Sequence, residues 1–510
     1  MLLATSTGGN LPSATVESML GIALRLRGHQ ADVLLCDGVL TACMMCEIGW
    51  YVDVDAFLRN GPRDRCMQCH APTKAMLDAA NVPVIGLSIH LTEEDRTNAA
   101  CVARTLPRDA IAELRVDGVA VGEHAVAGAL RFHARGTLGA DRTTESVLRR
   151  YLEASLLTLY ATRRLLSAGR YDVVVLNHGI YVPQGVVAET ARSLGIRIVT
   201  WHPAYRRQCF IFNHDDTYHH GLMREDTSDW EAMDWNDTHR ARIQDYLRSR
   251  WSGVEDWIRF QQDPEFERSA IARETGIDLT RPVIGLLTNV VWDAQLHYPS
   301  NAFPDMLTWL RATVAWFAKR TDLQLLIRIH PAEVTGSLRS RQPALDELVA
   351  AFPDWPPNVF VIGPESRLST YVAMEACNAV IIYGTKTGVE LAATGIPVIV
   401  AGEAWIRGKG VTLDATSATD YFALLARLPL SARMDDATTD RALRYAFHFF
   451  FRRMIPLEYL VERAGWPPFE VVLSGPDALL PDRSVGLDVV CNGILDGAPF
   501  VYPAERIPPR

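Results

Sequence analysis

A polar turn between two apolar runs holds residues of this chain that are well suited to bind a ligand. The turn, residues 384–388, follows the apolar run 379–383 and precedes the run 397–401, so a strand, a turn, a short helix and a second strand are expected. Backbone N–H groups are unpaired at a helix start, where the helix dipole is positive. The turn therefore predicts a phosphate site. An ordinary helix start capped by Thr385 or Thr387 is the alternative.

A cluster of cysteines near the N-terminus is the second group suited to chemistry. Five of the nine cysteines fall within residues 36–70: Cys36, Cys43, Cys46, Cys66 and Cys69. They form two CxxC pairs separated by nineteen residues, with Cys36 as a spare thiol or as a replacement for Cys46. This spacing is typical of a structural zinc ion held by four thiolates, and an iron–sulfur cluster is the alternative. We expect no catalytic metal, because no carboxylate ligand of an open site accompanies the thiols.

The elements that must position these residues alternate between strand and helix. In the first half of the chain the pattern predicts strands at 2–4, 32–36, 84–87, 172–177 and 197–201, and helices near 13–27, 144–168 and 184–194. A second series begins at Pro282, with strands at 283–287, 323–329, 359–362, 379–383 and 397–401, and helices at 305–319 and 345–352. This rhythm predicts parallel sheets with helices on both faces.

Two doubly wound, Rossmann-like α/β domains in tandem are the fold class that follows. We expect the first domain over residues 1–270, with the cysteine-rich segment 36–70 as a metal-binding insertion in it, and the second over residues 271–425. Residues 426–510 are predicted to form helices and a tail that pack back across the domains. Domains of this kind bind ligands at the carboxyl ends of their strands, and two of them would face each other across a cleft.

Polar residues follow the predicted strands of the second domain. The candidates for ligand binding there are Thr288, Asn289, Arg328, His330, Pro331, Ser366, Thr385, Lys386, Thr387, Gly388, Glu390, Arg407 and Lys409. Because parallel strands end at one edge of their sheet, we expect these residues to gather at that edge. The cations Arg328, Arg407 and Lys409 would suit a diphosphate or a sugar carboxylate. A solvated loop is the simpler alternative for Arg407 and Lys409.

Some of these residues resemble the motifs of a known family. The sequence Arg328-Ile-His330-Pro331, followed by Thr385-Lys-Thr387-Gly388-Val-Glu390, looks like the HP and hydroxyl-pair motifs of GT-B glycosyltransferases that use CMP-activated acid sugars. These enzymes include bacterial sialyltransferases and Kdo transferases. The stretch 395–412 also resembles capsule polysaccharide biosynthesis proteins. The resemblance covers residues 282–421 and implies a GT-B arrangement, with the donor in the second domain and the acceptor in the first.

The resemblance also implies roles for single residues. His330 would contact the phosphate or the base of a nucleotide-sugar donor. Thr385 and Thr387 would hold the phosphate of that donor. Glu390, on the helix that follows, would take a ribose hydroxyl.

The first domain should supply the acceptor side and a general base that deprotonates the acceptor hydroxyl. Gly8 and Gly9, after the first strand, would allow acceptor or donor to approach the backbone closely. The candidate catalytic residues lie after predicted strands: His178, His202, His214 and Asp215. A hydrogen-bonded structural role is the alternative for each histidine. Inverting and retaining mechanisms both stay open.

Composition narrows the classes of partner and compartment. The net charge of −9 argues against a nucleic-acid partner. No apolar run reaches the length needed to cross a membrane, and the N-terminus has no basic segment of a secretory signal. We therefore expect a cytoplasmic protein with reduced cysteines, and peripheral association with the inner face of the membrane stays open.

The expected activity is sugar transfer in surface or capsular polysaccharide biosynthesis. A nucleotide-activated donor, with CMP as one candidate nucleotide, would pass its sugar to a glycan or a lipid-linked acceptor. A nucleotide-sugar epimerase on the same scaffold is one alternative. A glycan-binding subunit of a polysaccharide assembly complex, without catalysis, is the other.

Overall fold

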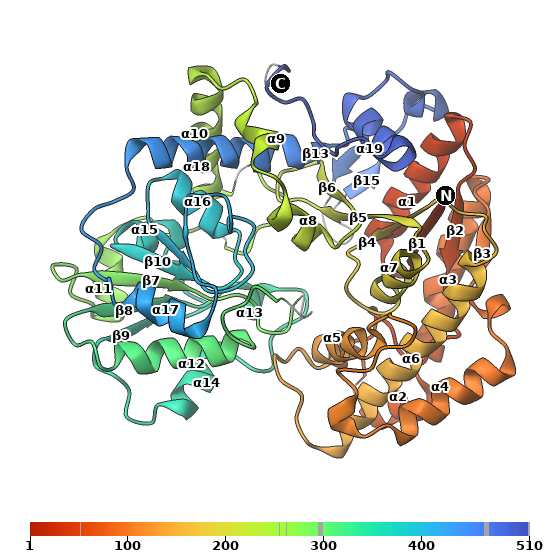
Figure 1. Ribbon diagram of the computed structural model, residues 1–510, viewed down its shortest axis with the longest axis horizontal. Coiled ribbons are helices and arrows are strands. Elements are labelled where there is room, and N and C mark those ends of the chain that lie inside the picture. The colour runs from red at the N-terminus through yellow and green to blue at the C-terminus, as the bar shows by residue number, and fades with distance from the viewer. Residues whose placement is uncertain (52, 254, 262, 294–298, 464–468, 508–510) are drawn as a thin grey trace. The chain divides into compact units, whose positions relative to one another are not determined.

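The chain forms two compact units in the computed structural model, which describes all residues except 52, 254, 262, 294–298, 464–468 and 508–510 (Figure 1). The first unit comprises Met1–Gly221 and Arg453–Tyr502. The described part of the second comprises Leu222–Asp293, 299–452 and 503–507. Residues 222–270, which the sequence grouped with the first domain, thus pack with the second.

The first unit is built on a seven-stranded sheet in the order β13-β6-β5-β4-β1-β2-β3. Its strands are β1 (Leu2–Ser6), β2 (Asp32–Leu35), β3 (Val84–Gly86), β4 (Val173–Asn177), β5 (Arg197–Pro203), β6 (Cys209–His214) and β13 (Ile455–Pro456). Strands β1 to β5 are parallel, whereas β6 and β13 add antiparallel pairs at one side. A small hairpin, β14 (Leu460–Glu462) and β15 (Phe469–Val471), lies outside this sheet. The order 3-2-1-4-5 is that of a doubly wound sheet, with its switch point between β1 and β4.

Helices of the first unit connect and cover these strands (Figure 1). They are α1 (Leu11–Leu26), α2 (Val54–Asn60), α3 (Arg63–Ala79), α4 (Glu93–Thr105), α5 (Val121–His133), α6 (Arg142–Leu166), α7 (Gln184–Ser193) and α19 (Val485–Asp496). The long helix α6 begins where the side chain of Asp141 accepts the backbone N–H of Thr144, 2.9 Å away. Its apolar positions recur at helical spacing, and α6 packs against α4, α5 and α7.

The second unit is built on a six-stranded, wholly parallel sheet in the order β12-β11-β10-β7-β8-β9. Its strands are β7 (Val283–Leu287), β8 (Gln324–Arg328), β9 (Val359–Ile362), β10 (Ala379–Ile382), β11 (Val398–Val400) and β12 (Leu413–Asp414). Every residue of β7, β8, β10 and β11 is buried, as expected of parallel strands that are covered on both faces. The winding again reverses at one place, between β7 and β10.

The helices of the second unit are shorter. They are α9 (Ser228–Glu231), α10 (Asp237–Ser252), α11 (Ser269–Thr275), α12 (Met306–Phe317), α13 (Ala332–Thr335), α14 (Ala344–Ala351), α15 (Thr370–Glu375), α16 (Thr387–Ala393), α17 (Ala418–Leu425) and α18 (Asp436–Phe447), while α8 (Tyr218–Arg224) spans the junction of the units. Helix α18 packs on α10 and α16. The aromatic run after α18, with Phe449 and Phe450 fully buried, is core and does not reach the surface.

The predicted fold class is confirmed in its main feature, two α/β units that are each built on a parallel sheet. The segment 36–70, predicted as a metal-binding insertion, contains α2 and the start of α3. Among the residues that the structure describes, no three metal-binding side chains meet at one point. No described helix is both long and apolar enough to cross a bilayer.

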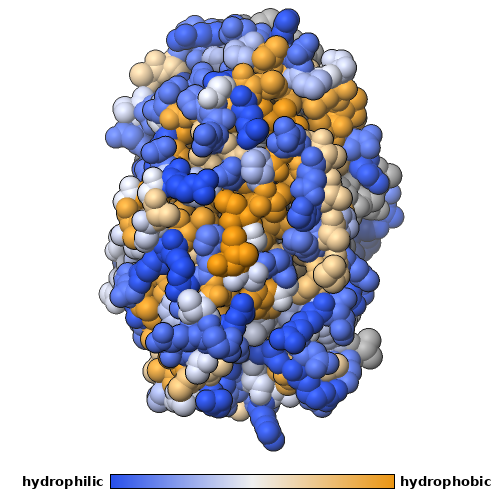
Figure 2. Space-filling view, turned by 90° about the vertical axis from the view of Figure 1, so that its right-hand side faces the viewer, coloured by the Kyte–Doolittle hydropathy of each residue, from blue (hydrophilic) through white to orange (hydrophobic). Residues whose placement is uncertain are grey.

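Apolar side chains gather on the face drawn in Figure 2. They lie along its middle, with hydrophilic side chains on either side. The most exposed large apolar side chains of the described residues are Ile89, 73% exposed, and Met67, 69% exposed. Single exposed apolar residues are ordinary on a protein surface and do not by themselves mark a site.

Candidate functional site

The switch point of the second sheet brings several predicted ligand-binding residues together. Strands β8, β7 and β10 are neighbours in this sheet, and their carboxyl ends form one edge. The polar side chains that follow these strands are those of Thr288, Asn289, His330, Thr385 and Thr387, which we call the switch-point cluster. In doubly wound sheets, ligands bind in the crevice outside this edge.

Hydrogen bonds connect the ends of β7 and β8. The backbone N–H of His330 donates to the Thr288 hydroxyl over 2.9 Å. The Nδ1 atom of His330 accepts the backbone N–H of Ala332 over 3.1 Å. Burial, reinforced by the nearby charges of Lys386 and Arg328, lowers the pKa of His330 to about 4. The ring is therefore neutral near pH 7, and because Nδ1 is an acceptor, its proton is on Nε2. His330 can thus donate one hydrogen bond to an anionic ligand.

The turn after β10 has the predicted polar geometry. Asn289 Oδ1 lies 3.3 Å from the backbone N–H of Gly384, so the loops after β7 and β10 contact each other across the switch point. The hydroxyls of Thr385 and Thr387 are 3.3 Å apart. Gly388 lies inside, where a Cβ atom would meet the side chain of Ile382 at 2.5 Å. Gly388 thus allows α16 to pack closely on its own strand, rather than contacting a ligand.

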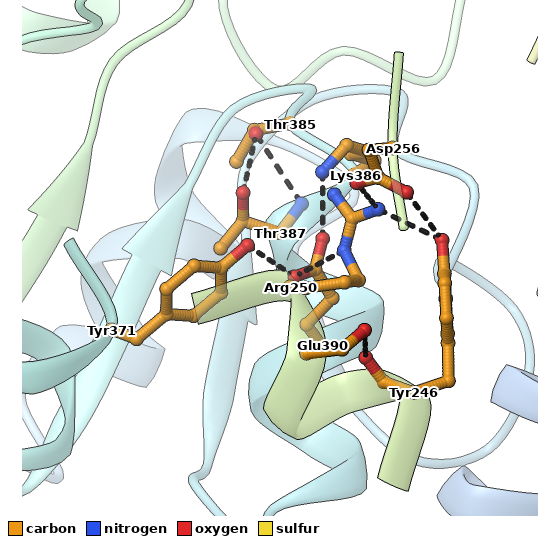
Figure 3. Close-up of polar contacts among 9 residues, drawn as sticks. Tyr246, Arg250, Asp256, Tyr371, Thr385, Lys386, Thr387 and Glu390 are labelled. Carbon is orange, nitrogen blue, oxygen red and sulfur yellow. Dashed lines mark hydrogen bonds and ion pairs between the residues drawn. The ribbon is translucent and has the colours of Figure 1, made fainter. Parts of the chain in front are cut away.

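Glu390 is engaged in a buried network of charges beneath the turn (Figure 3). Its carboxylate accepts bonds from Lys386 at 2.7 Å, Arg250 at 3.0 Å and the Tyr371 hydroxyl at 2.6 Å. Arg250 also pairs with Asp256. Burial alone would raise the pKa of Glu390, but Arg250 and Lys386 outweigh it and lower the pKa to about 2. Both Lys386 and Glu390 are therefore already paired within the unit, and this network holds α10 against α16.

The other predicted cations bind backbone carbonyls of the second unit. Arg328 is 1% exposed and donates to the carbonyls of Gly363 and Ser366. Arg407 reaches the carbonyls of Gly402 and Ala415, at 3.2 and 2.6 Å. Lys409 is also 1% exposed, and it reaches those of Met223 and Glu225, at 3.1 and 2.7 Å. All three side chains join loops of the fold, which differs from the diphosphate role that their charge predicted.

Two further predicted donor residues have local partners. The Ser366 hydroxyl donates to Glu274 of α11 over 2.8 Å. Pro331 precedes α13, and its carbonyl accepts the backbone N–H of Thr335 over 3.0 Å. Pro331 thus sets the short helix that presents Ala332 to the His330 ring.

In the first unit, two of the predicted catalytic histidines lie together at the carboxyl ends of β4 and β5. The ring centroids of His178 and His202 are 5.1 Å apart, and Tyr218 stacks on His202 at 4.6 Å. Tyr181 completes the group at 5.3 Å from His178. We call these four residues the imidazole cluster. It lies next to the switch point of the first sheet, because β4 neighbours β1.

Of the two histidines of this cluster, His178 is held in the neutral form, which can accept a proton. Burial, with His202 and Arg131 nearby, holds the pKa of His178 well below its usual range, so the ring is neutral. Its Nδ1 atom is buried and has no hydrogen-bond partner among the described residues. The Nδ1 atom of His202 is 2.6 Å from the carbonyl of Pro203, and a carbonyl only accepts. In a neutral His202 ring, Nε2 is therefore the basic atom.

His214 and Asp215 lie apart from the imidazole cluster. The His214 ring stacks on Phe500 at 4.4 Å, and its Nε2 atom contacts the carbonyl of Ala498 at 2.9 Å. Asp215 has a positive φ of 60° at the turn after β6, and its carbonyl accepts a bond from Arg192. Both residues therefore make local structural contacts in this fold, which for His214 was the alternative to a catalytic role.

Gly8 and Gly9 are covered by helix α3. A Cβ on Gly8 would lie 2.4 Å from the carbonyl oxygen of Cys69. The backbone N–H of Gly9 donates to the Cys69 sulfur over 2.8 Å, and the Thr73 hydroxyl donates to the carbonyl of Gly8 over 2.9 Å. The need for glycine here comes from the close approach of α3, rather than from a ligand.

Sequence reasoning missed several residues that the fold brings to these sites. Tyr181 and Tyr218 belong to the imidazole cluster, and their types gave no signal because aromatic residues mostly fill cores. Glu17 of α1 lies buried beneath β1 and β5, where it accepts bonds from Thr5 and Trp201. Burial raises the pKa of Glu17 to about 7, against the effect of those bonds. A lone acidic residue inside an apolar helix was the signal that could have found it.

Comparison with known proteins gives likenesses of structure only, since no protein-family model and no curated protein sequence matches the chain. The β-Kdo 2,4 transferase of KpsC from Thermosulfurimonas dismutans is 12% identical, with a TM-score of 0.36 over 54% of this chain and 79% of that chain. The β-Kdo 2,7 transferase of the same KpsC is 11% identical, with a TM-score of 0.33 over 62% and 88%. A putative UDP-N-acetylglucosamine 2-epimerase from Listeria monocytogenes is 10% identical, with a TM-score of 0.24 over 87% and 89%.

The chain thus resembles Kdo transferases of the kind that its motifs indicated, among other proteins. At these identities and TM-scores the likeness assigns no donor, no acceptor and no reaction to this chain. Those questions depend on the side chains of the two strand edges.

Proposed function

We propose that the protein is a glycosyltransferase that binds a nucleotide-activated sugar at the switch-point cluster of the second unit. The observation that carries this proposal is the meeting of the HP and hydroxyl-pair motifs at one switch point. His330 and Thr385 are 55 residues apart in the sequence, yet the strands that they follow, β8 and β10, flank the same strand β7.

The chemistry of the cluster suits a phosphate on a leaving nucleotide. A neutral His330 donates through Nε2. The Thr385 hydroxyl donates to the Thr387 hydroxyl, which leaves the Thr387 hydroxyl as a further donor. Fixed donors of this kind stabilise the negative charge that develops on the leaving phosphate as the sugar–phosphate bond breaks. The cations predicted to bind the donor are paired with carbonyls and carboxylates of the unit, so hydrogen bonds rather than free charges would carry the recognition.

We place the acceptor side in the first unit, at the imidazole cluster. Transfer requires that the acceptor hydroxyl lose a proton while its oxygen bonds to the anomeric carbon. A neutral His178 or His202 can take that proton. The acceptor would be a glycan or a lipid-linked saccharide in surface or capsular polysaccharide assembly, as the resemblance of the motifs implies.

A thermal-shift panel with CMP, CDP, UMP, UDP, GDP and dTDP tests the donor site. A ligand that binds only the folded protein raises its melting temperature, and one nucleotide of the panel should do so. Thr387→Ala and His330→Ala should each abolish that shift. The His330 backbone N–H that bonds to Thr288 remains in the alanine variant, so the fold should persist.

Thr394→Ala is the matched control, because Thr394 lies exposed just beyond the other end of α16. It should keep the full shift. If none of the six nucleotides shifts the melting temperature, or if His330→Ala and Thr387→Ala retain the shift, the switch-point cluster is not the donor site. Conversion of the sugar nucleotide without an acceptor, either to an epimeric sugar nucleotide or to free nucleotide and a free epimeric sugar, would favour an epimerase instead.

A further inference from the structure

Five thiols converge at the carboxyl edge of the first sheet. Cys36 follows β2 directly, Cys43 and Cys46 lie in the loop before α2, and Cys66 and Cys69 lie one turn apart on α3. None of them forms a disulfide. The Cys43 sulfur is 3.9 Å from the Cys46 sulfur. Cys43 also lies close enough to Cys36, Cys66 and Cys69 to raise the pKa of their thiols. Cys43 is thus the centre of the group.

Backbone N–H groups point at these sulfur atoms. Gly9 donates to Cys69 over 2.8 Å. Peptide groups of Gly38 and Leu40 lie near the sulfur of Cys36, and that of Met45 lies near the sulfur of Cys43. Metal-bound thiolates are commonly oriented by backbone N–H groups. The approach of these N–H groups is the surrounding expected of sulfur ligands.

We propose that Cys43, Cys46, Cys66 and Cys69 bind one zinc ion, with Cys36 as a fifth thiol that lies beside the site. With Zn–S bonds of about 2.3 Å, two ligands of a tetrahedral zinc stand about 3.8 Å apart. The sulfur–sulfur distance of 3.9 Å between Cys43 and Cys46 fits this value. The sequence spacing of the two CxxC pairs also suits a four-thiolate zinc site.

The zinc ion would connect α3 to the loop before α2. No three of the described metal-binding side chains yet share one point, so binding of the ion draws the two CxxC pairs together. Four protein ligands close the site, and its role is structural. Arg131 lies near Cys43 and its guanidinium donates to the carbonyl of Met44, so it offsets part of the negative charge of four thiolates.

The site adjoins the imidazole cluster of the same unit. Met44, between the first two thiols, packs on Tyr181, and Met45 lies against the same small core, as Tyr218 does. Arg131 also lies over the Tyr181 ring, 5.6 Å from its centroid. The zinc ion would therefore fix the wall of the imidazole cluster without touching a reacting atom. This inference does not depend on sugar transfer, because it can be tested on the metal alone.

Elemental analysis of the untagged full-length protein, purified under reducing conditions without chelator, is the test. We expect about one zinc per chain in the wild-type protein. Cys66→Ser and Cys69→Ser should each lower the zinc content at least about fivefold. Cys36→Ser is the matched control within the cluster, and Cys101→Ser, at an exposed position on α4, is the control outside it. Both should keep the metal.

A second measurement needs only the wild-type protein, so it tests the proposal even if the cysteine variants fail to fold. Zinc is replaced by Co²⁺ in the wild-type protein, and visible absorption should show tetrahedral cobalt bound to thiolates. A metal-free wild-type protein, or one with a Cys43–Cys46 disulfide, would overturn the proposal. A brown protein that contains iron would overturn zinc as the metal. Loss of metal in Cys36→Ser, with retention in Cys46→Ser, would overturn the ligand set.

Discussion

At the carboxyl edge of the second sheet the side chains are two hydroxyls, an amide and a neutral imidazole, whereas at the same edge of the first sheet they are aromatic rings, imidazoles and thiols. Both sheets wind in the same order and reverse at one point. In the second unit the loops after β7 and β10 meet through Asn289 and Gly384. In the first, α3 packs down on the loop after β1. The same winding of strands thus carries different side chains at its carboxyl edge in the two units.

The largest effect that would sharpen this contrast concerns the imidazole cluster. His178→Asn should lower the rate of transfer about 10²–10⁴-fold, because a general base contributes about that factor. Asparagine tolerates the left-handed backbone that His178 adopts, with φ of 69°, so the fold should remain. The rate is measured with the nucleotide sugar that the thermal-shift panel identifies.

Two comparisons accompany the His178 variant. The shift in melting temperature caused by the nucleotide should be unchanged, since the donor site lies in the other unit. His214→Asn should lower the rate less than about tenfold, because His214 lies apart from the cluster. If His178→Asn lowers the rate less than about tenfold, His178 is not the residue that takes the proton.

The next effect concerns the buried network of the second unit. Arg250→Met leaves the carboxylates of Glu390 and Asp256 without their shared partner, and the free energy of unfolding should fall by about 3–5 kcal/mol. Urea denaturation measures it. Arg248→Met, on the same helix, removes an exposed pair with Asp245 and should change stability by less than about 1 kcal/mol. If the Arg250 variant keeps its stability but is no longer stabilised by the nucleotide, the network serves ligand binding rather than folding.

A smaller effect on stability is expected in the loop after β1, which α3 covers. Gly8→Ala places a Cβ against the carbonyl of Cys69, and overpacking of this kind costs about 1–3 kcal/mol. Gly475→Ala is the control, because a Cβ there meets nothing within 4 Å. The measurement is the urea midpoint. If Gly8→Ala is as stable as the wild-type protein, α3 is not held against this loop, and the loop would be open to a ligand after all.

The smallest effect is a dependence of stability on pH. Burial lowers the pKa of His178, His214 and His330, the last to about 4. Below pH 6.5 these three histidines therefore bind protons in the unfolded chain that they do not bind in the folded chain, and their contribution to stability falls as the pH falls. At pH 5 the part due to His330 is roughly 1–2 kcal/mol. His330→Asn should reduce the difference between the urea midpoints at pH 7 and pH 5, and an undiminished difference would contradict it.

Much of the fold was predictable from local patterns. Strands β7 and β9 match their predicted bounds, because short apolar runs flanked by polar residues leave little choice of limits. Strand β6 was missed, since it adds an antiparallel strand to a series that predicted only parallel ones. The junction between the units falls at residue 221 rather than 270, because residues 222–270 pack with the second unit, and packing partners cannot be read from a local pattern.

The residue types of the candidate site could be predicted from the sequence, but the hydrogen-bond partners of those residues could not. His330, Thr385 and Thr387 could be placed at one edge, since they follow strands of one sheet. Arg328 and Lys409 bind carbonyls that only the folded loops bring to them, and no local pattern reveals such a partner. Likewise, Cys66 and Cys69 form the expected pair, yet helix α3 carries them, and its approach accounts for Gly8 and Gly9.

The chain passes between the two units more than once, and this has a consequence for synthesis on the ribosome. Strand β13 pairs with β6, and Asp488 of α19 forms an ion pair with Arg27 of α1, 2.5 Å apart. Late residues likewise complete the second unit, where the carbonyl of Glu505 contacts His239. Neither unit can finish folding until residues 453–507 have emerged. In a nascent chain of this protein both cores must therefore stay incomplete until that segment has been synthesised.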